Sequence, residues 1–422
     1  MIQDATPSAL KKARRPVVFV DDAAKLANCC EVLSSAPGAF AIDAERASGF
    51  RYGQRAYLIQ VARREGPIFL IDPAAISPDS RREDFAQLAA VLATDTWLLH
   101  AATQDLPCLA ELGLYPSRIF DTELGSRVVG LPRVGLGAVV EHYLNISLAK
   151  EHSAVDWSKR PLEQSWLDYA ALDVDVLHEL ADALEADLTE KNKLPWALDE
   201  FTHLLKFKPK PENPERWRNM TGLHEVKTQI GLSVARELWR QREALAIKLD
   251  VAPGRLIPDA SISHAAKSLP KTRPELAADK LFAGRASRSY LDTWWAALEA
   301  GRNSRDLPEL KVASVGIPNH RSWPNRWPNA HKRLVCARHY LSELAKENDL
   351  PLENMVSPDT IRQICWVERE STTTEQIESE LGALSTRPWQ IALIAETLAN
   401  SISLSHTFVV EKPEAEKTES EA

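Results

Sequence analysis

The first two hundred residues alternate short apolar runs with longer amphipathic ones. The runs at 38–45 and 57–72 have the composition of β-strands, and the turn sequence "RREG" divides the second run into two strands. Residues 82–94 then place apolar side chains at helical spacing, and 97–102 form a short buried strand. Alternating strands and helices predict an α/β domain that ends near residue 200.

Helical spacing continues at 105–113, 135–144 and 162–189, and Gly113 is placed to end the first of these helices. The segment 203–218 that follows carries three prolines and five basic residues. Because prolines prevent a helix from continuing, we predict that this segment is a linker.

Residues 220–405 are mostly helical in pattern and contain two stretches that resemble each other. Residues 238–267 and 337–366 each consist of an amphipathic helix, a proline-containing turn and a Pro-Asp pair that opens a second helix. We therefore predict five segments: an α/β domain at 1–202, the linker at 203–218, helical domains at 219–304 and 305–405, and a disordered acidic tail at 406–422.

The composition excludes several classes of protein. No apolar run approaches the roughly 20 residues that span a bilayer, and the basic N-terminus is followed only by "VVFV", which is too short for a secretion signal. Five cysteines without CxxC spacing argue against a disulfide framework or a zinc site, so we expect a cytoplasmic protein. The net charge of −8 excludes a general polyanion binder. No coiled-coil pattern occurs, and we expect a monomer that does not bind membranes.

The segment "AIDAERASGF" (41–50) puts Asp43 and Glu45 two positions apart at the end of a predicted strand. Alternate residues of a strand share a face, so the two carboxylates would repel each other unless a proton or a cation intervened. The alternative is a loop in which both groups are solvated.

Two further acidic positions have a similar setting. Asp105 begins a predicted helix just after a strand, and Asp173 lies on a helix one turn after Tyr169. Asp168 and Asp175 are rotated away from Asp173 on that helix, so we expect them to face solvent.

Four carboxylates brought together require cations, and hard oxygen ligands favour Mg²⁺ or Mn²⁺. Two such ions about 3.5–4 Å apart activate a water and stabilise the leaving oxygen of a phosphodiester. A tyrosine hydroxyl beside them can orient the attacking water. The acidic positions therefore favour a metal-dependent phosphodiesterase over a set of unrelated surface acids.

These residues carry a resemblance to a known family. "DAE" at 43–45, Asp105 in "HAATQDL" and "YAALD" at 169–173 resemble the three motifs of the DEDD exonuclease superfamily, in its tyrosine branch. The histidine branch would place histidine where Asp168 stands.

The rest of the chain extends the resemblance over roughly residues 17–405. The stretches 119–130 and 156–162 resemble bacterial ribonuclease D, and the two helical domains resemble the HRDC domains that follow its nuclease domain. The resemblance implies a ribonuclease-H-like α/β domain, with a mixed sheet of about five strands and helices on both sides, followed by two all-α HRDC-type domains.

The resemblance also implies roles for five side chains. Asp43 would bridge two metal ions, Glu45 and Asp173 would complete the site of the attacking water, Asp105 would hold the second ion, and Tyr169 would position the water.

The implied activity is that of a 3′–5′ exoribonuclease that needs two divalent ions, Mg²⁺ or Mn²⁺, and releases nucleoside 5′-monophosphates. Its partner would be RNA with a single-stranded 3′ end, and tRNA precursors are the expected substrates. Two alternatives remain open. A DNA 3′–5′ exonuclease would use the same carboxylates, because the sugar is recognised elsewhere. A non-catalytic RNA-binding protein would use the helical domains alone.

Other residues near these motifs have more ordinary interpretations. His100 is expected to be a core histidine, and Lys150 and Arg160 are expected to be solvated or in salt bridges. Gln60 is expected either to face a substrate groove or to have a structural role.

Overall fold

The computed structural model describes residues 7–148, 155–208, 213–311 and 316–408. The chain divides into two compact units. The first comprises residues 1–121, 140–181 and 204–313, and the second comprises residues 122–139, 182–203 and 314–422. The acidic sequence that was predicted to form a disordered tail lies outside the described residues from position 409 onward, as does Lys150.

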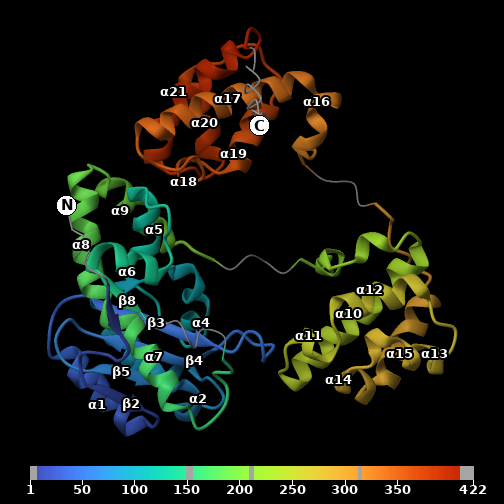
Figure 1. The fold of residues 1–422 in the computed structure, drawn as a ribbon, viewed down its shortest axis with the longest axis horizontal. Coiled ribbons are helices and arrows are strands. Elements are labelled where there is room, and N and C mark those ends of the chain that lie inside the picture. Colours follow the sequence, from blue (N-terminus) through green and yellow to red (C-terminus); the bar gives the residue numbers. More distant parts are fainter. Residues whose placement is uncertain (1–6, 149–154, 209–212, 312–315, 409–422) are drawn as a thin grey trace, which may run out of the picture. The chain divides into compact units, whose positions relative to one another are not determined.

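A six-stranded mixed sheet forms the centre of the N-terminal α/β domain (Figure 1). Its strands lie in the order β2 (Val17–Val20), β5 (Ile68–Ile71), β4 (Ala56–Ala62), β3 (Phe40–Arg46), β6 (Thr96–Leu99) and β7 (Arg118–Asp121). Strand β4 is antiparallel to both of its neighbours, and all other neighbouring pairs are parallel. The predicted mixed α/β fold is confirmed. The sixth strand, β7, was not predicted. Its four residues begin with an exposed arginine and are followed immediately by a helix, so they show no clear strand pattern.

Helix α7 (Gln164–Asp175) packs on the face of β3, β4 and β5, whereas α1 (Ala23–Ser34) contacts β2 and α3 (Ala86–Leu92). The other elements before residue 205 are α2 (Pro73–Ile76), α4 (Leu106–Glu111), α5 (Thr122–Val129), α6 (Leu136–Leu144), α8 (Leu177–Glu190), α9 (Leu194–Leu204) and the parallel pair β1 (Ser8–Leu10) and β8 (Ile146–Leu148). Of these, α5 belongs to the second compact unit, as does nearly all of α9.

The single helix that was predicted over 162–189 is divided into α7 and α8 at Val176. Just before the break, the backbone carbonyl of Asp175 accepts a hydrogen bond of 3.0 Å from Arg14. The Asp175 carboxylate is buried, and it accepts hydrogen bonds from the side chains of Arg14 (3.0 Å) and Arg15 (2.9 Å). The prediction that Asp175 faces solvent is therefore wrong, because the helical pattern could not show that a distant basic segment packs on this side of the helix.

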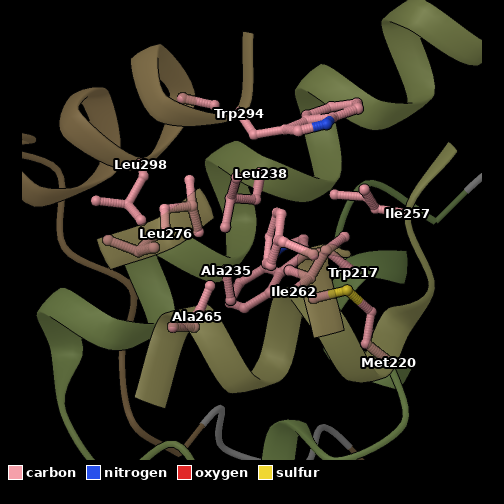
Figure 2. Packing of buried hydrophobic residues seen from close by; sticks show 14 of the residues in the cluster. Trp217, Met220, Ala235, Leu238, Ile257, Ile262, Ala265, Leu276, Trp294 and Leu298 are labelled. Carbon is pink, nitrogen blue, oxygen red and sulfur yellow. The ribbon is translucent and has the colours of Figure 1, made fainter. Parts of the chain in front are cut away.

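The first helical module (residues 213–311) contains α10 (Gln229–Leu249), α11 (Pro253–Leu256), α12 (Asp259–Ser268), α13 (Arg273–Ala278), α14 (Arg285–Ser289) and α15 (Leu291–Arg302). Figure 2 shows its core, in which Leu238, Ile262 and Trp294 lie together. Trp217, which falls within the predicted linker, is fully buried in the same core.

The second helical module (residues 316–408) contains α16 (Trp323–Arg326), α17 (Pro328–Glu347), α18 (Leu352–Met355), α19 (Pro358–Trp366), α20 (Thr374–Ala383) and α21 (Pro388–Leu404). The helices α17, α18 and α19 repeat the order and the lengths of α10, α11 and α12 closely. Each long helix is followed by an aspartate in the left-handed region, Asp250 at φ 46° and Asp349 at φ 47°. The repeat predicted from the sequence is present in the fold.

Two further properties concern the helices and the cysteines. Among the described residues, no helix combines the length and the apolar composition needed to cross a bilayer. The five cysteines are all buried and none forms a disulfide.

Candidate active site

Asp43 and Glu45 lie on the same face of β3, directly under α7. The strand continues to Arg46, so the alternative of a solvated loop at this position is wrong. From α7, Asp173 reaches the same place: one carboxylate oxygen from each of Asp43, Glu45 and Asp173 lies within 4.8 Å of the others. The three predicted carboxylates, separated by up to 130 positions in the sequence, thus form one cluster.

Asp105 lies at the start of α4, the position predicted for it, where it is buried and lines the same cavity. It is not part of the tight group of three carboxylates found among the described residues. The turn before it is held by Asp121, whose carboxylate accepts hydrogen bonds from the backbone amides of Ala101 (3.0 Å) and Ala102 (2.8 Å). Ala101 has a φ of 65°, a conformation that costs energy for alanine and is maintained here by the buried carboxylate.

Tyr169 lies one helical turn before Asp173 and lines the cavity together with the carboxylates, as predicted. The cavity has a volume of about 450 Å³. Its lining consists of the five predicted site residues together with Ala44, Arg46, Ser48, Gly49, Phe50, His100, Gln104 and Val155.

Burial and mutual repulsion disfavour the charged forms of the clustered carboxyls. Burial raises the pKa of Asp43 to about 6. Burial, together with the negative charge of Asp43, raises the pKa values of Glu45, Asp105 and Asp173 well above their ordinary range. Burial and the neighbouring carboxylates also raise the pKa of Tyr169, so its hydroxyl keeps its proton at neutral pH.

Arg46 contributes a positive charge to this acidic cavity. Its guanidinium opposes the rise in the pKa values of Asp43, Glu45 and Asp105. Strict alternation along β3 would place its side chain on the other face from Glu45, but the pairing with β4 shifts register between Glu45 and Arg46. A bulge of this kind changes the direction of nearby side chains. The sequence pattern therefore gave no signal for Arg46 as a site residue.

Three other residues near the motifs, for which more ordinary roles were expected, are also described by the structure. His100 is half-buried and is among the residues that line the cavity, and its interpretation as a core histidine stays a prediction. Gln60 lies opposite Asp43 on β4 but is fully buried and is not among the residues that line the cavity, which favours a structural role. Arg160 forms an ion pair of 2.6 Å with Asp72, as expected.

The donor set suits a divalent cation. The carboxylates of Asp43, Glu45 and Asp173 supply hard oxygen ligands from three positions, and their repulsion is relieved only by protons or by positive charge. Burial and mutual repulsion raise the pKa values of these carboxyls, and a divalent cation among their oxygens would offset both effects.

Comparison with known families agrees with this geometry. Residues 17–189 match the family described as 3′-5′ exonuclease. Residues 231–298 match the HRDC domain, and residues 316–402 match the family described as 3′ to 5′ exonuclease C-terminal domain.

Individual relatives cover most of the chain. Ribonuclease D of Escherichia coli (strain K12) is 26% identical over 396 residues, which are 91% of this chain and 97% of that protein. Ribonuclease D of Pseudomonas paraeruginosa is 30% identical over 269 residues, which are 62% of this chain and 68% of that protein.

Solved structures show the same similarity. A protein from Bifidobacterium adolescentis has a TM-score of 0.85 at 32% identity, covering 94% of this chain and 99% of that one. The structure of Escherichia coli RNase D, described as an exoribonuclease involved in structured RNA processing, has a TM-score of 0.66 at 25% identity. It covers 92% of this chain and 98% of that one.

Proposed function

Because this chain belongs to the ribonuclease D family of 3′–5′ exonucleases, we propose that it hydrolyses RNA from the 3′ end and releases nucleoside 5′-monophosphates. The observation that carries this proposal is the convergence of Asp43, Glu45 and Asp173 on one point of a cavity that Asp105 and Tyr169 also line.

In the proposed site, Asp43, Glu45, Asp105 and Asp173 hold two divalent cations, Mg²⁺ or Mn²⁺. When bound, the cations supply an activated water and stabilise the leaving oxygen of the phosphodiester. The tight group of three carboxylates accounts for most of this ligand set, and Asp105 approaches it from the start of α4.

The protein's own side chains have separate tasks. The protonated hydroxyl of Tyr169 donates a hydrogen bond to the attacking water or accepts one from it, and so orients the water toward the phosphorus. Arg46 offers a guanidinium to a phosphate oxygen of the substrate within the same cavity. The depth at which the carboxylates are buried strengthens these electrostatic interactions.

The proposed substrate is RNA with a single-stranded 3′ end, with tRNA precursors as the expected natural class. The support for RNA is the HRDC match after the nuclease domain and the names of the relatives, since the acidic cluster itself serves RNA and DNA alike. We expect the protein to act as a monomer in the cytoplasm.

The test uses 5′-labelled RNA and DNA oligonucleotides of identical sequence, each with Mg²⁺, with Mn²⁺ and with EDTA. We expect RNA to shorten stepwise from its 3′ end with either ion and to remain intact with EDTA. Equal degradation of DNA would contradict the proposed preference for RNA and favour the alternative of a DNA exonuclease. Binding of RNA without shortening under any condition would leave the non-catalytic alternative.

The variant Asp43→Asn tests the site itself. It removes one carboxylate from the centre of the cluster while keeping its size, and we expect hydrolysis to fall by at least about 10³-fold, the order of loss seen when a central catalytic group is removed. Asp168→Asn, on the same helix as Asp173 but paired with Lys12 at 3.0 Å, is the control and should retain full activity. Persistent turnover in Asp43→Asn would show that the site is wrongly assigned.

A further inference from the structure

The loop that follows β3 brings an aromatic side chain to the cavity that holds the carboxylates. Ser48, Gly49 and Phe50 lie along the same cavity of about 450 Å³ as the acidic cluster. Phe50 is partly buried, and it brings an aromatic ring to an otherwise largely polar site.

The first helical module holds the backbone of this loop. The amide of Ala252 donates a hydrogen bond of 3.0 Å to the carbonyl of Phe50, and Arg255 Nε donates one of 2.7 Å to the carbonyl of Gly49. The carboxylate of Asp250 accepts hydrogen bonds of 3.2 Å from the amides of Tyr52 and Gly53. The loop between β3 and β4 is thus fixed on both sides of Phe50 by one turn of the helical module.

The same turn also supports the aromatic ring. The guanidinium carbon of Arg255 lies 4.1 Å from the centroid of the Phe50 ring, a cation–π arrangement. Because the Arg255 head group is also hydrogen-bonded to Gly49, the ring is held against a cation whose own position is fixed. An aromatic ring fixed in this way beside a phosphate-cleaving site is suited to stacking on a nucleobase, and stacking of this kind tolerates any base.

We propose that Phe50 is a stacking platform for one of the two 3′-terminal nucleobases of the substrate, and that Arg255 is a positioning residue that sets the orientation of this platform. The inference rests on the proposed function, because it takes the cavity to be the place where a nucleic acid 3′ end binds. It assigns the first helical module a role within the active site in addition to any contact with more distant RNA.

The test compares RNA that carries all its bases with RNA whose last two nucleotides are abasic. For Phe50→Leu we expect kcat/KM on base-bearing RNA to fall roughly 5- to 150-fold, the range for loss of one base–aromatic stack. On the abasic RNA, Phe50→Leu and the wild type should be equal, whereas Phe50→Tyr should behave as the wild type on both. An equal loss of kcat/KM on both substrates, or no loss on base-bearing RNA, would show that Phe50 is not a stacking platform.

Arg255→Met tests the positioning residue. It should lower kcat/KM on base-bearing RNA by less than Phe50→Leu does and leave the abasic RNA unaffected. Arg240→Met is the matched control, since Arg240 lies on α10 of the same module and forms an ion pair of 2.9 Å with Glu237. If both arginine variants have the same effect, Arg255 has no positioning role.

Binding measurements separate this inference from the proposed function. Fluorescence anisotropy in Ca²⁺, a cation that replaces Mg²⁺ without its strict octahedral geometry, reports the affinity for each RNA in the absence of turnover. Weaker binding of base-bearing RNA alone by Phe50→Leu would support the platform even if the wild type hydrolysed no RNA. The wild-type oligonucleotide assay tests the activity independently.

Discussion

At the scale of single residues, the acidic cluster lowers the stability of the fold, and a bound cation would relieve this effect. Asp43, Glu45 and Asp173 bring three carboxylates together, and burial raises the pKa of each. A carboxyl whose pKa is higher in the folded than in the unfolded state binds more protons when folded, so stability falls as pH rises between the two values. For Asp43 this interval runs from its ordinary value of about 4 up to about 6.

Repulsion among these carboxylates should make the stability of the protein depend on metal and on pH. In EDTA, we expect the melting temperature of the wild type to fall from pH 5 to pH 8 relative to that of Asp43→Asn, which has lost one repelling charge. Millimolar Mn²⁺ at pH 8 should raise the melting temperature of the wild type and change that of Asp43→Asn much less. Differential scanning calorimetry measures both effects, and equal metal-induced shifts in the two proteins would contradict a metal site at Asp43.

Arg46 gives a second prediction at this scale. If its guanidinium binds a substrate phosphate, Arg46→Gln should raise KM about 10-fold or more, because a charge-assisted hydrogen bond contributes about 1.5–3 kcal/mol. Steady-state kinetics on labelled RNA measures this value, and increasing salt should reduce the difference from the wild type. An unchanged KM would exclude a contact between Arg46 and the substrate.

At the scale of elements, helix α7 carries two candidate site residues and is anchored at its C-terminal end. Tyr169 and Asp173 face the cavity, while Asp175 is buried against Arg14 and Arg15. Burial by itself would raise the pKa of Asp175, but the hydrogen bonds from the two arginines bring it below its ordinary value. A lowered pKa contributes stability that is present above the unfolded value of about 4 and is lost as pH falls through the folded value.

Asp175→Asn should therefore lower the free energy of unfolding by about 2–3 kcal/mol at pH 7, since a charged partner of two arginines is removed. The difference from the wild type should shrink below pH 4. Urea denaturation at several pH values measures it. Asp168→Asn is the control on the same helix, because its partner Lys12 is exposed and the pair contributes about 1 kcal/mol or less. Equal losses in the two variants would contradict the anchoring role of Asp175.

Close helix packing in the first helical module leads to another prediction. A Cβ atom added at Gly301 on α15 would lie 2.5 Å from the Cα of Val234 on α10. The two backbones would have to separate, so Gly301→Ala should destabilise the module by more than about 2 kcal/mol. Gly382→Ala, at a helical position with no atom within 4 Å, should be neutral or slightly stabilising in the same thermal denaturation measurement.

At the scale of the whole molecule, the two helical modules use the same turn for contacts with earlier segments of their own compact units. In the first, Asp250 and Arg255 bind the loop after β3. In the second, the carbonyl of Asp349 accepts a hydrogen bond of 2.9 Å from Lys193, and Asn354 donates one of 3.0 Å to the carbonyl of Arg127. Arg255 and Asn354 each lie five positions after the left-handed aspartate of their own module.

The contact in the second module depends on Gly130. Its φ is 97°, and a Cβ atom there would meet the carbonyl oxygen of Asp349 at 2.2 Å. Gly130→Ala should therefore weaken this contact and accelerate amide hydrogen exchange in 349–355. Gly135→Ala, in the same segment but with nothing within 4 Å, should leave exchange unchanged. Identical exchange in both variants would contradict a contact at Gly130.

Local sequence patterns were sufficient to predict the alternation of strands and helices, the internal repeat and the five candidate site residues. These features depend on periodicity, on capping and turn residues, and on motifs whose members lie close together along the chain. The proximity of Asp43 and Asp173 in space was predicted through the resemblance of the motifs to a family. No periodic pattern relates two positions that are 130 residues apart.

Contacts between distant segments could be found only in the folded protein. The burial of Asp175 depends on the N-terminal arginines, the place of Arg46 in the cavity depends on a register shift between β3 and β4, and the fixation of Phe50 depends on a turn two hundred residues later. Each is a property of two surfaces that meet in space, and neither surface by itself carries a local pattern that identifies its partner.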